Sequence, residues 1–99
     1  FPPYCHQALL RAEAPRMEAA LQFLEEARDT AQGLAGPVTV FDPVPAQMAR
    51  LAGRERAQLL VQSPSRTALQ TFLSGWHEAL KRLDRRRVRW SLDVDPLEF

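Results

Sequence analysis

The 99-residue chain is long enough for one hydrophobic core and too short for two, so we expect a single domain. Hydrophobic residues form 45% of the chain and charged residues 25%, as in a typical folded domain, and no apolar run is long enough to span a membrane. The net charge of +1 conceals an asymmetry. Residues 1–49 carry three arginines against six acidic residues, whereas residues 50–99 carry nine arginines and one lysine against six acidic residues. A cationic second half is typical of a protein that binds a polyanion, although a solvated basic face is nearly as common.

The reactive side chains argue against catalysis and metal binding within this chain. Cys5 is the single cysteine, which excludes an intramolecular disulfide and indicates a reducing compartment. Cys5 and His6 are neighbours on a predicted strand, so they point to opposite faces and cannot act together as nucleophile and base. One cysteine and two histidines are too few for a convincing zinc site. We therefore expect no catalytic residue, no metal site and no cofactor in this chain.

The first half of the chain predicts a linker remnant, a strand, a helix and a second strand. The chain starts without methionine, so we expect residues 1–3 to be the remnant of a linker and residues 4–99 to form the domain. Side chains of residues 4–12 alternate between two faces, which predicts a strand. Residues 38–41 predict a short second strand, and the prolines that follow at 43 and 45 belong to an edge or a loop. Residues 46–53 predict a connection that is partly helical. The intervening helix opens at Pro15, ends near Gly33, Gly36 and Pro37, and has Met17, Ala20, Leu21, Leu24, Ala27, Ala31 and Leu34 at helical spacing.

Residues 54–63 predict a central strand with one wet, basic face. Ala57, Leu59 and Val61 share one side, while Arg54, Arg56, Gln58 and Gln62 share the other. Ser63 is expected to cap the next helix and Pro64 to occupy its first position. This helix runs to about residue 83 and places Arg66 and Gln70 on its first two turns, beside the core stripe. The stripe consists of Leu69, Phe72, Leu73, Trp76, Leu80 and Leu83.

Residues 87–94 predict the last strand, which ends at Asp95-Pro96. Its alternation groups Trp90 with Val88 and Leu92, which indicates a core position rather than a base-stacking platform. The order βαββαβ, with right-handed crossovers, predicts an α+β, ferredoxin-like fold: a four-stranded antiparallel sheet with two helices on one face. The other face or its rim is then expected to carry Arg11, Arg54, Arg56, Gln58, Arg87 and Arg89.

Three segments carry a specific resemblance to a known family. They are Asp-Pro-Val-Pro-Ala at 42–46, the run from Gly53 through Gln-Ser-Pro-Ser-Arg at 62–66, and Arg-Val-Arg-Trp-Ser-Leu-Asp-Val-Asp-Pro at 87–96. Together they resemble the C-terminal domain of the primosomal replication-restart helicases, the PriA or primosomal protein N′ family. The resemblance covers nearly the whole chain. One difference is Asp42, where many members of the family have glycine.

The resemblance implies a fold like that of ribosomal protein S10 and a role as a binding module. Family members bind single-stranded or forked DNA, and they bind the acidic C-terminal tail of single-stranded DNA-binding protein. By motif match, Arg66 and Gln70 would contact this tail. An arginine near a helix N-terminus also suits an anionic chain end on physical grounds.

The resemblance also implies properties of a longer parent protein. This parent would be a bacterial superfamily 2 helicase that unwinds DNA in the 3′-to-5′ direction in the cytoplasm, near the nucleoid. Its ATP, magnesium and zinc sites would lie upstream, and its other domains and further primosome proteins would be partners.

The arginine face allows more than one interpretation. Arg54, Arg56, Arg87 and Arg89 are candidate DNA-binding residues, or they form ion pairs with other domains or with Glu55 and Asp93. A free-standing S10-like RNA-binding protein and a small-molecule regulatory domain are the alternative functions.

Overall fold

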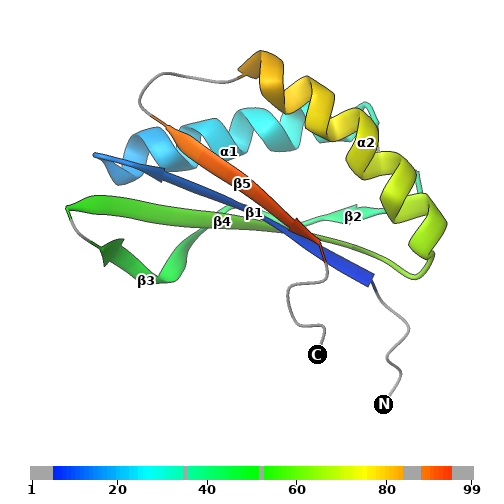
Figure 1. Cartoon of the computed structure of the whole chain (residues 1–99), viewed down its shortest axis with the longest axis horizontal. Helices are drawn as coiled ribbons and strands as arrows, with labels where there is room; N and C mark the ends of the chain where they lie inside the picture. The colour runs from blue at the N-terminus through cyan, green and yellow to red at the C-terminus, as the bar shows by residue number, and fades with distance from the viewer. Residues whose placement is uncertain (1–5, 35, 52, 84–87, 95–99) are drawn as a thin grey trace.

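In the computed structural model, the residues described are 6–34, 36–51, 53–83 and 88–94. Within these ranges five strands form one antiparallel sheet, and both helices cover the same face of it (Figure 1). This arrangement confirms the predicted α+β, ferredoxin-like class. The elements are β1 (His6–Ala14), α1 (Met17–Gln32), β2 (Thr39–Val40), β3 (Val44–Leu51), β4 (Arg54–Ser63), α2 (Arg66–Leu83) and β5 (Arg89–Val94).

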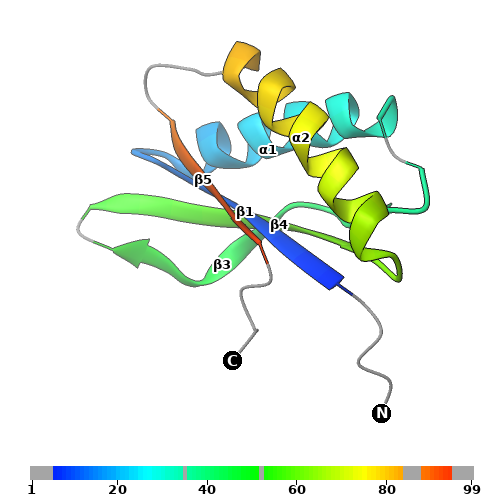
Figure 2. The ribbon, with the colours of Figure 1, turned by 45° about the vertical axis from the view of Figure 1, so that its right-hand side comes forward.

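The two longest strands, β1 and β4, form the centre of the sheet. They pair antiparallel from His6 opposite Ser63 to Ala14 opposite Glu55. β5 pairs with the other side of β1, while β2 and β3 both pair with β4. Figure 2 shows that both helices stay on one side of the sheet when the molecule is turned. The predicted central position of residues 54–63 is therefore confirmed.

The sheet has five strands within the described ranges rather than the four that were predicted. The prediction of a partly helical connection over residues 46–53 was wrong, because β3 extends through most of it. β2 pairs with the C-terminal part of β4 and β3 with its N-terminal part, so the two form one interrupted edge. The register shifts within β3, which removes the regular alternation by which a strand is predicted. Gly53 closes the β3–β4 hairpin with a φ of 79°, a conformation that favours glycine.

Asp42 lies on this interrupted edge, between β2 and β3. Its carboxylate forms an ion pair with the guanidinium of Arg28 on α1. The contact ties the edge of the sheet to the helix that covers it. Asp42 thus has an arginine partner within the fold.

The core lies between the helices and the covered face of the sheet. The α2 stripe is confirmed, since its first five predicted members are buried and Leu83 is half-buried. In α1, Phe23 is fully buried although it was not among the predicted positions. Leu34 is 43% exposed because α1 ends at Gln32, before it. The largest fully buried hydrophobic side chains are Trp76, Phe23, Leu10, Leu24, Leu59, Leu69, Leu80 and Val61.

The start of α2 differs from the prediction. The helix begins at Arg66, and the backbone N–H of Ala68 donates to Ser65 Oγ at 3.1 Å, so Ser65 rather than Ser63 is the N-cap. Pro64 precedes the helix. Ser63 is fully buried; its Oγ donates to the carbonyl oxygen of Pro37 at 2.7 Å and accepts from the N–H of Ser65 at 3.1 Å. The Ser63 hydroxyl is therefore bonded to Pro37 and Ser65, and the hydroxyl of Ser65 caps the helix.

Trp90 lies on the helix side of β5, as predicted. Its ring is stacked on Phe23 with a centroid distance of 6.3 Å, and the ring of His77 meets it edge-on at 5.6 Å. The first strand runs two residues further than predicted, to Ala14. The predicted strand residues 4 and 5, and Arg87 at the start of the last strand, lie outside the described residues.

Candidate functional site

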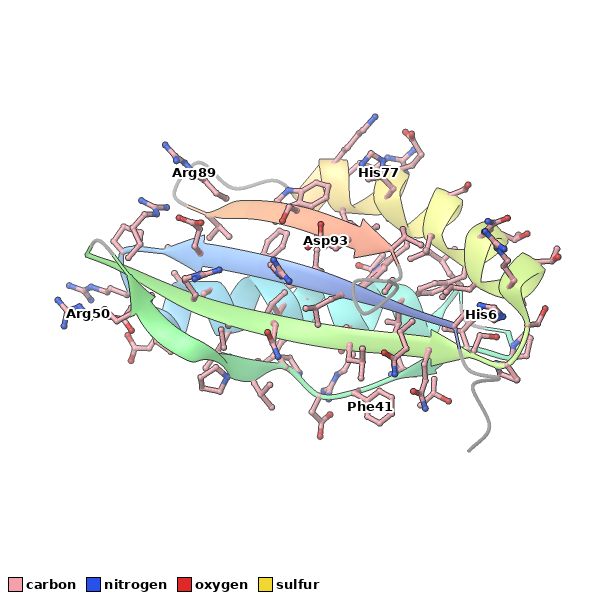
Figure 3. The ribbon with its side chains drawn as sticks, turned by 60° about the horizontal axis from the view of Figure 1, so that its bottom comes forward. His6, Phe41, Arg50, His77, Arg89 and Asp93 are labelled. Atoms are coloured by element: carbon pink, nitrogen blue, oxygen red, sulfur yellow. The ribbon has the colours of Figure 1, made fainter. Side chains whose placement is uncertain are left out.

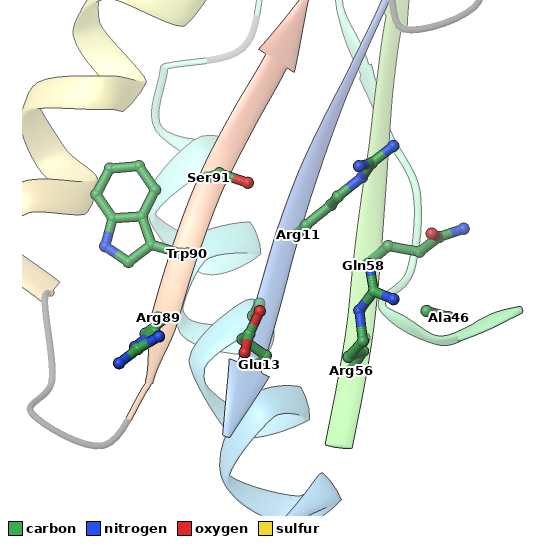
Figure 4. Close-up of a pocket in the computed structure, with 10 residues that line it drawn as sticks. Arg11, Glu13, Ala46, Arg56, Gln58, Arg89, Trp90 and Ser91 are labelled. Atoms are coloured by element: carbon green, nitrogen blue, oxygen red, sulfur yellow. The ribbon is translucent and has the colours of Figure 1, made fainter. Parts of the chain in front are cut away.

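The face of the sheet away from the helices, called the open face below, carries the candidate arginines that the structure describes; Figure 3 labels Arg89 among them. Residues directly opposite on neighbouring strands point to the same face. The register therefore sets Arg56, Glu13 and Arg89 in one row across β4, β1 and β5. The adjacent row is Gln58, Arg11 and Ser91. These two cationic rows line a pocket of about 390 Å³ (Figure 4).

Two of the arginines on the open face are held by carboxylates. Arg54 Nε donates to Glu13 Oε1 at 2.8 Å, and its Nη2 donates to the backbone oxygen of Glu13 at 3.3 Å. Arg11 Nη1 lies 3.3 Å from Asp93 Oδ2. Both pairs connect a central strand to its neighbour. Their arginines therefore link adjacent strands of the sheet and also add positive charge to the open face.

Arg56 and Arg89 differ from these two. Within the described ranges neither has an ion-pair partner, and they flank Glu13 on either side. The predicted alternative of ion pairs with Glu55 and Asp93 does not apply to the described candidates, since Glu55 pairs with Arg50 at 3.5 Å and Asp93 with Arg11. Arg87 lies outside the described residues. The structure thus separates Arg54, which is bound to a carboxylate, from Arg56 and Arg89, which have no ion-pair partner in the described part of the chain.

An apolar patch adjoins the cationic rows on the open face. Leu9 lies opposite Leu60, and the N–H of Phe41 donates to the Leu60 carbonyl oxygen at 2.9 Å, which continues this row to the sheet edge. Val44 lies opposite Gln58 and is 47% exposed. Phe41 is 39% exposed. Sequence reasoning missed this patch, although Leu9 and Leu60 interrupt the polar side of their strands.

The predicted tail-binding residues lie at the start of α2, and both are exposed. Arg66 is the first helical residue, and Gln70 follows one turn later. Gln70 lines a groove between α2 and the strand β5, with a volume of about 740 Å³. The described residues that line it do not include Arg66. They are Gln70, Leu73, Ser74, His77, Glu78, Leu92 and Val94.

This α2–β5 groove combines an apolar strip with polar ends. Val94 is 50% exposed and Leu92 half-buried, and Leu73 borders them from α2. Gln70 and Glu78 lie two helical turns apart along its length. Such a groove suits an extended peptide with an apolar side chain.

No candidate metal site was found in the described part of the chain. No group of three or more His, Cys, Asp or Glu side chains within it is arranged to hold a metal ion. Among the same residues, neither helix is long and apolar enough to cross a membrane.

Comparison with known structures shows the fold. The de novo designed protein Foldit4 matches with a TM-score of 0.60 and 11% identity, covering 89% of this chain and 94% of the design. A designed protein with a ferredoxin fold matches with a TM-score of 0.57 and 12% identity, covering 91% of this chain and 83% of the design. At such low identity these likenesses concern shape alone.

Comparison with known sequences shows the family. The replication restart protein PriA of Haemophilus influenzae is 38% identical over 101 residues, which cover 99% of this chain and 13% of that protein. The chain thus spans about an eighth of that relative's length. The family model of the primosomal protein N C-terminal domain matches residues 1–97. The chain therefore belongs to the family of primosomal protein N C-terminal domains.

Proposed function

We propose that this domain is a binding module of a replication-restart helicase and performs no chemistry of its own. It binds single-stranded or forked DNA on its open face and the acidic tail of single-stranded DNA-binding protein beside α2. Its parent protein is an ATP-dependent helicase of the bacterial cytoplasm, with ATP, magnesium and zinc sites outside this chain. It works with other domains of that protein and with other primosome proteins. The 38% identity to a replication restart protein supports this role.

The observation that carries the DNA-binding part is the row Arg56, Glu13 and Arg89. The two outer guanidiniums have no ion-pair partner within the described ranges, and they lie on a sheet face that no helix covers. A guanidinium matches a phosphate in charge and geometry. Phosphate contacts displace condensed counterions, so binding through this row weakens as the salt concentration rises.

Arg56→Ala combined with Arg89→Ala tests the DNA contact. We expect weaker binding of single-stranded and forked DNA, and a salt dependence whose log–log slope falls by about 1.4 for two lost phosphate contacts. Arg82→Ala is the matched control, because Arg82 is an exposed arginine on α2, away from the open face. Fluorescence anisotropy at several salt concentrations measures both the dissociation constant and the salt slope. Duplex RNA is a further ligand in the same assay. An unchanged dissociation constant and slope contradict the proposal.

The tail-binding part depends on Arg66 and Gln70. Arg66 occupies the first position of α2, where the positive end of the helix dipole also attracts an anion. A charge-assisted contact contributes about 1.5–3 kcal/mol, or roughly 10- to 150-fold in affinity. The apolar strip of the α2–β5 groove, which Gln70 lines and Arg66 does not, suits a hydrophobic side chain of the tail.

Arg66→Ala in the full-length parent protein tests this part. We expect at least tenfold weaker binding of an acidic tail peptide by titration calorimetry. Thr67→Ala is the matched control, since Thr67 is the exposed neighbour on the same helical turn. Equal affinity of the Arg66 variant and the wild type excludes this contact.

A further inference from the structure

We propose that Phe41 is a base-stacking residue for single-stranded DNA that crosses the open face. This inference rests on the proposed DNA-binding function and deepens it. It assigns the phosphates to the cationic rows and the bases to the apolar patch of Leu9, Leu60, Phe41 and Val44.

The position of Phe41 is the first argument. Val40 packs against the core on the helix side, so its neighbour Phe41 faces the other way. Its N–H donates to the Leu60 carbonyl oxygen at 2.9 Å, which anchors its backbone to β4. The side chain is nevertheless 39% exposed and lies at the edge of the open face in Figure 3. A fixed backbone with a partly exposed ring provides a preformed platform.

The second argument is the distance to the cationic rows. Phe41 lies beside Leu60, which is two residues from Gln58 and four from Arg56 along β4. At the rise of a strand, Leu60 lies about 7 Å from Gln58 and about 13 Å from Arg56. A nucleotide with its base on the apolar patch therefore has its neighbouring phosphates within reach of the long arginine side chains.

Charge complementarity decides between possible occupants of the patch. Among the described residues, the open face carries Arg11, Arg54, Arg56 and Arg89 against the carboxylates of Glu13 and Asp93. The face therefore has an excess of positive charge. A strand of DNA supplies negative phosphates that match this excess and flat base surfaces that match the patch. Bases in a duplex are stacked on one another, so the patch favours single strands.

The test compares Phe41→Ala and Phe41→Leu with the wild type in binding to oligothymidine and to an abasic strand of equal length. Stacking on one base predicts that both variants bind oligothymidine about tenfold more weakly. Their log–log salt slope stays that of the wild type, because no phosphate contact is lost. Binding of the abasic strand is unchanged. Phe41→Tyr retains the ring and is expected to bind oligothymidine as the wild type does.

Leu34→Ala is the control, since Leu34 is a comparably exposed apolar residue that lies against α2, outside the patch and away from the open face. An effect of less than twofold supports stacking, whereas an effect equal to that of Phe41→Leu overturns it in favour of nonspecific apolar contact. Wild-type affinity in both Phe41 variants also overturns it and indicates that a protein surface covers the patch. Failure of the inference is distinct from failure of DNA binding itself, which the Arg56 and Arg89 variants test independently.

Discussion

The indole Nε1 of Trp76 donates a hydrogen bond to the backbone carbonyl oxygen of Ala27 at 2.9 Å. Trp76 is fully buried on α2, and Ala27 is fully buried on α1. The bond therefore joins the two helices in the interior, where no water competes for either group. It fixes the position of α2, and with it the wall of the α2–β5 groove.

Trp76→Phe removes this bond and leaves a cavity where the larger ring was. We expect the free energy of unfolding to fall by about 2–4 kcal/mol, from the lost hydrogen bond and the lost packing. Urea denaturation measures the change. Leu34→Ala, at a side chain that is 43% exposed, is expected to cost far less. A Trp76→Phe cost below that of Leu34→Ala contradicts the structural role of the bond.

Gly75→Ala is expected to stabilise the protein. Gly75 lies within α2, and an added Cβ meets only the Leu34 side chain, at the ordinary contact distances of 3.8 and 3.9 Å. Alanine in a helix interior is favoured over glycine by about 0.5–1 kcal/mol. Gly53→Ala provides the contrast. A Cβ added at Gly53 meets open space, but the φ of 79° strains alanine, so the melting temperature should rise for the first variant and fall for the second.

Two serine substitutions distinguish the observed start of α2 from the predicted one. Ser65→Ala removes the N-cap and is expected to cost about 1 kcal/mol of unfolding free energy. Ser63→Ala removes two part-buried hydrogen bonds of a fully buried side chain, to the carbonyl oxygen of Pro37 and from the N–H of Ser65, so we expect a larger cost of about 1–3 kcal/mol. Chemical denaturation ranks the two variants. The reverse order indicates that Ser63 has no more than a local role.

Glu13→Gln tests the negative charge between Arg56 and Arg89. The carboxylate accepts a hydrogen bond from Arg54, and the pair is partly exposed, so its loss should change stability by about 1 kcal/mol or less. Removing the negative charge raises the net positive charge of the open face by one. We expect tighter binding of single-stranded DNA with a steeper salt dependence, measured by anisotropy. Unchanged or weaker binding indicates that DNA does not approach this row.

The regular elements could be predicted because their side chains repeat with a single period. The buried positions of β4 alternate from Ala57 to Ser63, and the α2 stripe follows the helical spacing, so burial on one face determined both patterns. β3 was missed because its register shifts between Pro45 and Arg50, and a shifted strand has no single alternation to detect. Phe23 was left out of the predicted α1 stripe. It is nevertheless at helical spacing, three residues after Ala20 and four before Ala27, and it is fully buried beside Leu24.

The family, the fold class, the buried stripe of α2 and the basic second half could be predicted from the residues alone, since all of these depend on local pattern and residue type. Which arginines are bound to carboxylates depends on the folded chain. Arg54 reaches Glu13 across 41 positions of the chain, while Arg56, two residues away, has no ion-pair partner within the described ranges. Strand register brings such distant side chains together, and register follows from the packing of the whole sheet rather than from any local segment.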